Sequence, residues 1–285
     1  MKRGLVYVLT SPNCPFVKIC GTERPLAERL RGINGFSPYG AHGPWELLDC
    51  LQVVDWFSVE QRLHAQFGAH RTATVPGARE LFGIPGSEAR KALLATEPAL
   101  RIGHAETEKL FRDYDFRNYL FRLFEITGIF GCTDLQGAWT LSLYPKTGGG
   151  RFFTLNIGTH EVAFSPLPEP KNGPSYHFLV ADELILAYPD VEKWLVKHGG
   201  SADASPYASA KEGAVSIEFQ ATFAEAEGFL ALRGARRALV AYWHDWLSEM
   251  RERRTRSLFA RFHNYDAVQS LVDFRRARQA AVANE

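Results

Sequence analysis

Two short apolar runs near the N-terminus constrain the fold of this 285-residue sequence more than any other feature. Residues 5–9 and 16–20 are rich in β-branched and aromatic side chains, and Ser11-Pro12-Asn13 separates them. Runs of this length, closed by turn-forming residues, are typical of β-strands. We therefore predict an N-terminal β-hairpin with a loop of about six residues, longer than a tight two-residue turn.

The sequence that follows the hairpin alternates between helix and strand patterns up to about residue 90. A helix is predicted over 25–31 with Pro25 in its first turn, and a strand over 45–54. In residues 59–67, Val59, Leu63 and Phe67 recur every four positions, which predicts a helix with one buried face. Residues 79–83 form a short further element. These patterns predict a small α+β domain over 1–90.

The helix and strand patterns of the second part of the chain predict another α+β domain over 105–285, after a linker over 91–104. Its helical stretches are 105–127, 191–197 and 232–284, the last with breaks near Thr255 and His263. Strand patterns occupy 139–144, 151–157, 160–164 and 214–223, while the periodicity of 178–188 suits either a strand or a short helix. Residues 199–213, rich in Gly, Ser and Ala, predict an exposed loop.

The near-neutral net charge of +1 hides a strong asymmetry along the chain. Residues 1–100 carry 11 basic and 9 acidic groups, residues 101–232 carry 11 and 17, and residues 233–278 carry 11 and 5. All 11 basic groups of the last segment are arginines. A balanced total therefore does not argue against a nucleic-acid partner, because the average conceals a basic C-terminal segment.

The four cysteines form no CxxC pair, which argues against a zinc site and predicts free thiols in a reducing compartment. The first apolar run ends at Thr10, too early for a signal peptide, and no run reaches the length of about 18 residues that a membrane span needs. We therefore expect a cytoplasmic protein with no membrane partner.

Several linked blocks in the N-terminal part carry a family resemblance. They are Leu-Val-Tyr at 5–7, Val-Lys-Ile-Cys-Gly-Thr at 17–22, Glu-Arg-Leu at 28–30, Glu-Gln-Arg-Leu-His-Ala-Gln-Phe at 60–67, Arg71, and Arg-Glu-Leu-Phe at 79–82. In this order and spacing, the region of residues 4–86 resembles the GIY-YIG nuclease superfamily, in particular its T5orf172 branch. The resemblance implies a short antiparallel sheet flanked by helices.

The resemblance also implies a metal-dependent DNA endonuclease. Glu80 would be the ligand of Mg²⁺ (or Mn²⁺), a hard cation that prefers oxygen. Arg29 would bind phosphate oxygens through its planar fork. Tyr7, exposed beside the cation, would act as a base if neighbouring positive charge acidified its phenol.

Three further residues complete the site that the resemblance implies. Lys18, placed across the hairpin from Tyr7, would lower the pKa of Tyr7 or hold a phosphate. His64 would relay a proton or bind phosphate, and Arg71 would contact nucleic acid. Structural alternatives stay open for Tyr7 as a core residue, Arg29 as a solvated helix residue, His64 as a buried histidine and Glu80 as a turn residue.

Two residues depart from the family pattern. Leu5 replaces the first glycine of the signature, which this branch tolerates. Cys20 replaces a glycine of the second signature, and a side chain there alters the pocket if the backbone needs a positive φ or a close ligand approach. Activity can therefore be weakened, leaving a domain that only binds.

Basic residues of the second domain are candidates for contacts with nucleic acid, and we expect double-stranded DNA as the partner. They are Lys146 and Arg151, at the ends of aromatic-rich strands, and Arg251, Arg253, Arg254, Arg256 and Arg261. The aromatic residues are equally compatible with a packed core, and the arginines with a solvated helix face or a homo-oligomer interface.

Three functions remain in competition at this point. The first is an endonuclease whose C-terminal part selects the target. By analogy with the family, such an enzyme would act in restriction of, or defence against, foreign or modified DNA. The second is a nucleic-acid-binding protein without catalysis, and the third is an assembly protein whose arginines bind an acidic partner.

Overall fold

The computed structural model describes residues 2–36, 38–72, 74–170, 173–205, 207–208, 210–253 and 257–283. The chain divides into two compact units by its internal packing. Unit 1 is Met1–Ala105 with Asn264–Ser270, and unit 2 is Glu106–His263 with Leu271–Glu285. The packing thus groups the predicted linker, 91–104, with unit 1, together with a short segment from near the C-terminus.

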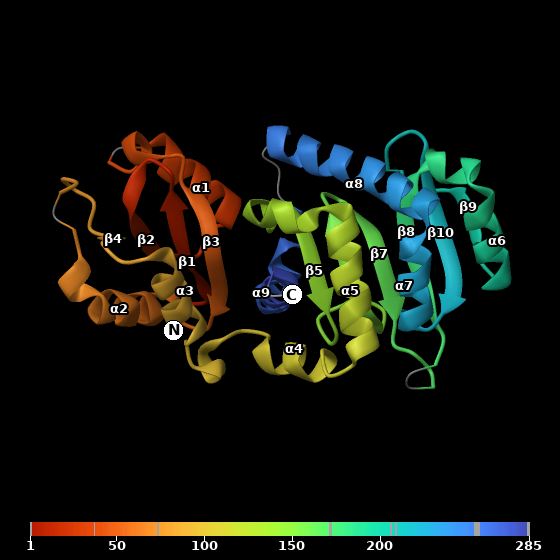
Figure 1. Ribbon diagram of the computed structural model, residues 1–285, viewed down its shortest axis with the longest axis horizontal. Coiled ribbons are helices and arrows are strands. Elements are labelled where there is room, and N and C mark those ends of the chain that lie inside the picture. The colour runs from red at the N-terminus through yellow and green to blue at the C-terminus, as the bar shows by residue number, and fades with distance from the viewer. Residues whose placement is uncertain are drawn as a thin grey trace. The chain divides into compact units, whose positions relative to one another are not determined.

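Unit 1 is built on an antiparallel sheet with the strand order β3-β1-β2-β4, drawn in red and orange in Figure 1. Its strands are β1 (Gly4–Ser11), β2 (Cys14–Thr22), β3 (Glu46–Val53) and β4 (Leu81–Phe82). Its helices are α1 (Leu26–Gly35), α2 (Trp56–Gln66) and α3 (Gly86–Leu94), with 3-10 turns η1 (Gly40–His42), η2 (Gly68–His70) and η3 (Pro98–Leu100). The predicted small α+β architecture is confirmed.

The central strand β1 is buried on both faces, because its side chains alternate between two hydrophobic clusters. Leu5, Tyr7 and Leu9 join a cluster with residues of α1 and with Trp45. Val6 and Val8 join the other cluster, with residues of α2 and α3. Helix α1 therefore covers one face of the strand, and helices α2 and α3 cover the other.

The hairpin between β1 and β2 is tighter than predicted. Ser11 pairs with Cys14, so only Pro12 and Asn13 lie between the strands instead of about six residues. The prediction missed this because it ended each strand at its last apolar residue, although the backbone ladder continues through polar residues. In this register Tyr7 pairs with Cys20, and Lys18 pairs with Leu9.

Unit 2 contains a six-stranded antiparallel sheet with the order β5-β6-β7-β8-β10-β9. Its strands are β5 (Trp139–Leu143), β6 (Arg151–Ile157), β7 (His160–Pro166), β8 (Ser175–Asp182), β9 (Ser201–Ala204) and β10 (Ala214–Ala221). Its helices include α5 (Tyr114–Thr127), α6 (Pro189–Lys197), α7 (Phe223–Ala231) and α8 (Arg233–Arg253), with η4 (Ile129–Leu135), η5 (Glu183–Ala187) and η6 (Ala260–Phe262). Helices α4 (His104–Leu110) and α9 (Tyr265–Ala283) each begin in unit 1 and end in unit 2.

Aromatic side chains form much of the core of unit 2. Helices α5 and α7 lie side by side against the sheet (Figure 1), where Tyr119 and Phe223 pack on His177 of β8. Helix α8 packs against β8, and its Trp243 donates a hydrogen bond to the Val180 carbonyl at 2.9 Å. Trp139 and Phe153 are fully buried, so these aromatic residues belong to a core and not to a base-stacking surface.

Several elements after residue 104 differ from the sequence prediction. The helical stretch predicted over 105–127 is two separate helices, α4 and α5. The loop predicted over 199–213 contains the edge strand β9, which pairs with β10. Helix α7 was not predicted, although Thr222 and Glu225 form a capping box at its start. The fold class, a mixed α and β structure with a helical C-terminus, is confirmed. Across the described ranges, no helix combines the length and apolar character needed to cross a membrane.

Candidate active site

A cavity of about 400 Å³ opens in unit 1, bounded by β2, α1, α2 and the segment before β4. The residues that line it are Cys20, Gly21, Arg29, Trp56, Phe57, Glu60, Gln61, His64, Arg71, Arg79 and Glu80. Four predicted site residues, Arg29, His64, Arg71 and Glu80, are among them. The other two do not line the cavity but contact residues that do: Tyr7 contacts Arg29, and Lys18 contacts Glu80.

Lys18 forms an ion pair with Glu80, and its side chain is completely buried. The ammonium lies 3.9 Å from the centre of the Tyr39 ring, whose hydroxyl donates to the Glu80 carboxylate at 3.4 Å. Burial by itself raises the pKa of Glu80, but the charge and hydrogen bond of Lys18 outweigh it and hold the pKa below its usual value. Glu80 therefore presents a carboxylate, partly exposed to the cavity, at neutral pH.

Tyr7 is buried, contrary to the expectation that it is exposed beside the cation. Its hydroxyl accepts a hydrogen bond from Arg29 Nε at 3.1 Å. Burial raises the pKa of Tyr7 well above its usual value, and Arg29 only partly opposes this. Positive charge does not acidify this phenol here, because Lys18 is paired with Glu80 and burial outweighs the charge of Arg29.

Arg29 connects the tyrosine to the cavity. Besides its bond to Tyr7, it places Nη2 3.5 Å from the sulfur of Cys20. Burial raises the pKa of the Cys20 thiol, so the thiol stays protonated at neutral pH. One edge of the guanidinium is thus fixed by the hairpin, and the side chain as a whole lines the cavity.

Helix α2 contributes Glu60 and His64, one turn apart on the same buried face. His64 Nε2 lies 2.8 Å from the Ile19 carbonyl, which can only accept, so this nitrogen carries a proton. Burial lowers the pKa of His64, which favours the neutral ring. Burial, together with the nearby Glu80 carboxylate, raises the pKa of Glu60 to about 7.

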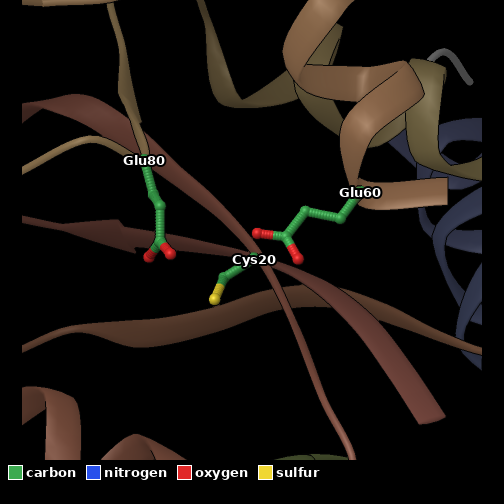
Figure 2. Close-up of side chains that lie close together, drawn as sticks. All are labelled: Cys20, Glu60 and Glu80. Carbon is green, nitrogen blue, oxygen red and sulfur yellow. The ribbon is translucent and has the colours of Figure 1, made fainter. Parts of the chain in front are cut away.

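Cys20, Glu60 and Glu80 form the cluster shown in Figure 2, with one ligand atom of each within 4.8 Å of the others. The two carboxylates project from α2 and from the segment before β4, and the thiol from β2 between them. Carboxylate oxygens are the ligands that Mg²⁺ and Mn²⁺ prefer, whereas a thiol suits softer metals. Glu60 and Glu80 therefore fit a hard divalent cation, which would also relieve the repulsion between them.

Comparison with known families assigns the part of the chain that builds this cavity. Residues 4–96 match the T5orf172 domain. This domain belongs to the GIY-YIG-like nuclease superfamily, so the resemblance noted in the sequence is confirmed. The rest of the chain matches no family. Comparisons of the whole chain with curated proteins and with solved structures found no match.

Several residues in or beside the cavity were not predicted as site residues, and four of them carry groups that the site's chemistry can use. Glu60 and Arg79 were read only as parts of the family blocks, Cys20 was read only as a departure from the family pattern, and Tyr39 was not singled out. A charged residue at a buried helix position, one turn before His64, is a sequence signal that would have marked Glu60. No comparable signal marks Tyr39, which reaches Lys18 only through the tertiary fold.

The predicted nucleic-acid contacts of unit 2 lie outside the T5orf172 domain, and most of them have intramolecular partners. Arg151 forms an ion pair with Glu161 and stacks over Phe164. Arg251 contacts Asp134 at 3.2 Å, Arg253 contacts Glu249 at 3.0 Å, and Arg261 lies 4.6 Å from the Phe262 ring. Lys146 is exposed. Arg254 and Arg256 fall outside the described residues.

Proposed function

We propose that the T5orf172 domain hydrolyses phosphodiester bonds of DNA with a divalent cation held by Glu80 and Glu60. The convergence of these two carboxylates with Arg29 on one cavity carries the proposal. When bound, such a cation supplies a water of lowered pKa and neutralises charge on the phosphate. The nuclease superfamily of the domain supports this chemistry.

The chain's own residues supply phosphate binding and orientation. Arg29 is fixed by Tyr7 and Cys20, so it can bind phosphate oxygens without reorganising. Arg71 and Arg79 line the same cavity and form no ion pair within the described residues. Lys18 and Tyr39 position Glu80, while Tyr7, kept protonated, positions Arg29.

Cleavage of supercoiled plasmid DNA by the full chain, with Mg²⁺ or Mn²⁺ and with a chelator, tests this function. We expect Glu80→Gln and Arg29→Gln to lower the rate about 100-fold or more, the range seen when one electrostatic stabiliser is removed. Glu88→Gln and Arg31→Gln are matched controls on exposed helix positions of the same domain and should retain the rate. Failure of the wild-type chain to cleave any DNA with either metal would contradict the proposal.

Nucleic-acid binding without cleavage is a second candidate, and the Lys18–Glu80 ion pair favours it. The Lys18 ammonium already neutralises the carboxylate that would hold the cation. Salt-sensitive binding of DNA, with no cleavage under either metal, would support this alternative.

Two finer parts of the proposal follow from the reaction. One site per chain cuts one strand, so we propose that two chains act together when both strands of DNA are cut. A second unit beside a nuclease domain also suits a role in restricting foreign DNA, which we propose by analogy. Reduced phage plating on cells that express the wild-type chain, but not the Glu80→Gln variant, tests that role.

A further inference from the structure

The basic segment of residues 233–278 has a part that the sequence prediction did not choose. Among its later arginines that the structure describes, Arg251 pairs with Asp134, Arg253 pairs with Glu249, and Arg278 lies over the Phe121 ring. The start of the segment is different. Arg233, Arg236 and Arg237, here called the α8 arginines, are exposed and form no ion pair within the described residues.

The α8 arginines lie on one face of the helix, since their spacing of three and four residues brings them together. Like charges at this spacing repel one another. They also occupy the first two turns of α8, where the helix dipole is positive and disfavours cations, and no acidic residue lies in that first turn. A bound anion would relieve both repulsions.

A cavity of about 630 Å³ lies beside these three side chains. The α8 arginines form its charged part, and Leu184, Ala231, Val240 and Ala241 form its apolar part. A volume of this size is typical of sites that hold a small molecule or one unit of a polymer. The lining suits a ligand that has an anionic group beside a less polar surface, as a phosphate has beside its sugar.

The charge of the α8 arginines narrows the class of ligand. The preceding segment, residues 101–232, has 11 basic and 17 acidic groups, so the α8 arginines begin the basic part of the chain. A polyanion would be attracted locally to the three free guanidinium groups. The T5orf172 domain implies nucleic acid as the partner of the chain, and its phosphates are the matching anions.

We propose that the α8 arginines and the adjoining cavity bind the phosphodiester backbone of the nucleic acid that unit 1 acts on. The guanidinium forks hold phosphate oxygens, and the apolar lining receives the sugar. This inference rests on the proposed nucleic-acid function. It places the contacts of unit 2 at the start of α8 and away from Arg251, Arg253 and Arg261.

Fluorescence anisotropy of a labelled DNA duplex tests the proposal, with the full chain, a chelator to prevent cleavage, and a series of salt concentrations. The test variant is Arg233→Gln/Arg236→Gln/Arg237→Gln. The matched control is Arg251→Gln/Arg253→Gln/Arg261→Gln, which removes the same charge. Each lost phosphate contact lowers the slope of log K against log salt by about 0.9, so we expect the test variant to lose about 2–3 from the slope.

We expect the control variant to keep the wild-type slope, and an all-lysine version of the α8 arginines to restore most of it. An unchanged slope in the test variant, with wild-type circular dichroism, would overturn this site and leave the nuclease proposal intact. Equal losses in the test and control variants would also overturn it. Absence of wild-type binding to both duplex and single-stranded DNA would contradict the proposed function itself. If the chain bound a poly-glutamate peptide more tightly than DNA, the ligand would be an acidic peptide and the proposal would be overturned.

Discussion

At the scale of single residues, the candidate site concentrates ionisable groups that a protein interior normally excludes. Lys18, Glu60 and His64 are buried. Lys18 has Glu80 as its counter-charge, and the pKa shifts of Glu60 and His64 favour their neutral forms. The pKa values of two carboxylates a few ångströms apart are shifted in opposite directions. Lys18 lowers the pKa of Glu80, whereas burial and the charge of Glu80 raise the pKa of Glu60. This arrangement makes the stability of unit 1 depend on pH and on each ion-pair partner.

The first prediction concerns Glu60. Folding raises its pKa from the usual 4.5 to about 7, so between these values the folded chain binds more protons than the unfolded chain. Its contribution to stability is fully present below pH 4.5 and is lost as the pH rises through 7, by about 3 kcal/mol in total. Urea unfolding in the presence of a chelator should show that loss for the wild type relative to Glu60→Gln. Parallel pH profiles of the two chains would contradict it.

The second prediction concerns the Lys18–Glu80 pair. Replacing Glu80 by Gln leaves the fully buried Lys18 ammonium without its counter-charge. We expect the free energy of unfolding to fall by about 3 kcal/mol. This value is at the lower end of the range for breaking a buried ion pair, because Glu80 is partly exposed. The double variant Lys18→Met/Glu80→Gln should recover most of this loss in urea unfolding. A double variant as unstable as Glu80→Gln alone would show that the pair is not the cause.

At the scale of elements, the site depends on how closely β2 approaches α2. Gly21 of β2 lies against the Trp56 ring, and a Cβ built there would also come within 3.1 Å of Glu60 Oε2. The strand can therefore bring Cys20 and Glu60 together only because its next residue has no side chain. The family blocks in the sequence include this glycine, but the reason for it is visible only when α2 is in place.

The third prediction tests this close approach. Gly21→Ala should force the Trp56 indole outward and destabilise unit 1 by about 1–3 kcal/mol, the usual range for overpacking. It should also lower cleavage, because Glu60 moves with its helix. Gly68→Ala is the control, since nothing lies within 4 Å of its added Cβ. Thermal unfolding that is the same for both alanine variants would refute the close-packing argument.

At the scale of the whole molecule, unit 1 is completed by a segment distant in the sequence. Asn264–Ser270 belongs to it, and Tyr265 joins the cluster that contains Tyr7 and Cys20. Asp266 is almost fully buried and accepts hydrogen bonds from Arg101 Nε at 2.9 Å and His104 Nδ1 at 3.0 Å. The T5orf172 match ends at residue 96, so these contacts involve residues outside the matched part of the chain.

The fourth prediction follows from this segment. Asp266→Ala leaves Arg101 largely buried without its carboxylate, and we expect unit 1 to lose about 3 kcal/mol of stability. Hydrogen exchange should then increase in β1, β2 and β3. Ser270→Ala, which removes only a hydrogen bond to the Asp266 carbonyl within the same helix, should leave that exchange nearly unchanged. Unaltered exchange in the Asp266 variant would show that the segment does not stabilise the sheet.

The sequence by itself determined the features that local pattern and family signature encode. The strands of the N-terminal hairpin, the helix that carries Glu60 and His64, the mixed α and β class and the T5orf172 assignment follow from apolar periodicity and ordered motifs. The convergence of Arg29, His64 and Glu80 also follows, because the family blocks specify which elements meet.

Only the tertiary structure decided the protonation and partners of these groups, since burial and charge depend on elements far apart in sequence. Packing buried Tyr7 and paired Lys18 with Glu80, so the expected acidic phenol is instead a protonated group that positions Arg29. The same holds for the arginines of unit 2. The sequence counts their charges equally, but the fold pairs Arg251 and Arg253 with carboxylates and leaves the α8 arginines without an ion pair among the described residues.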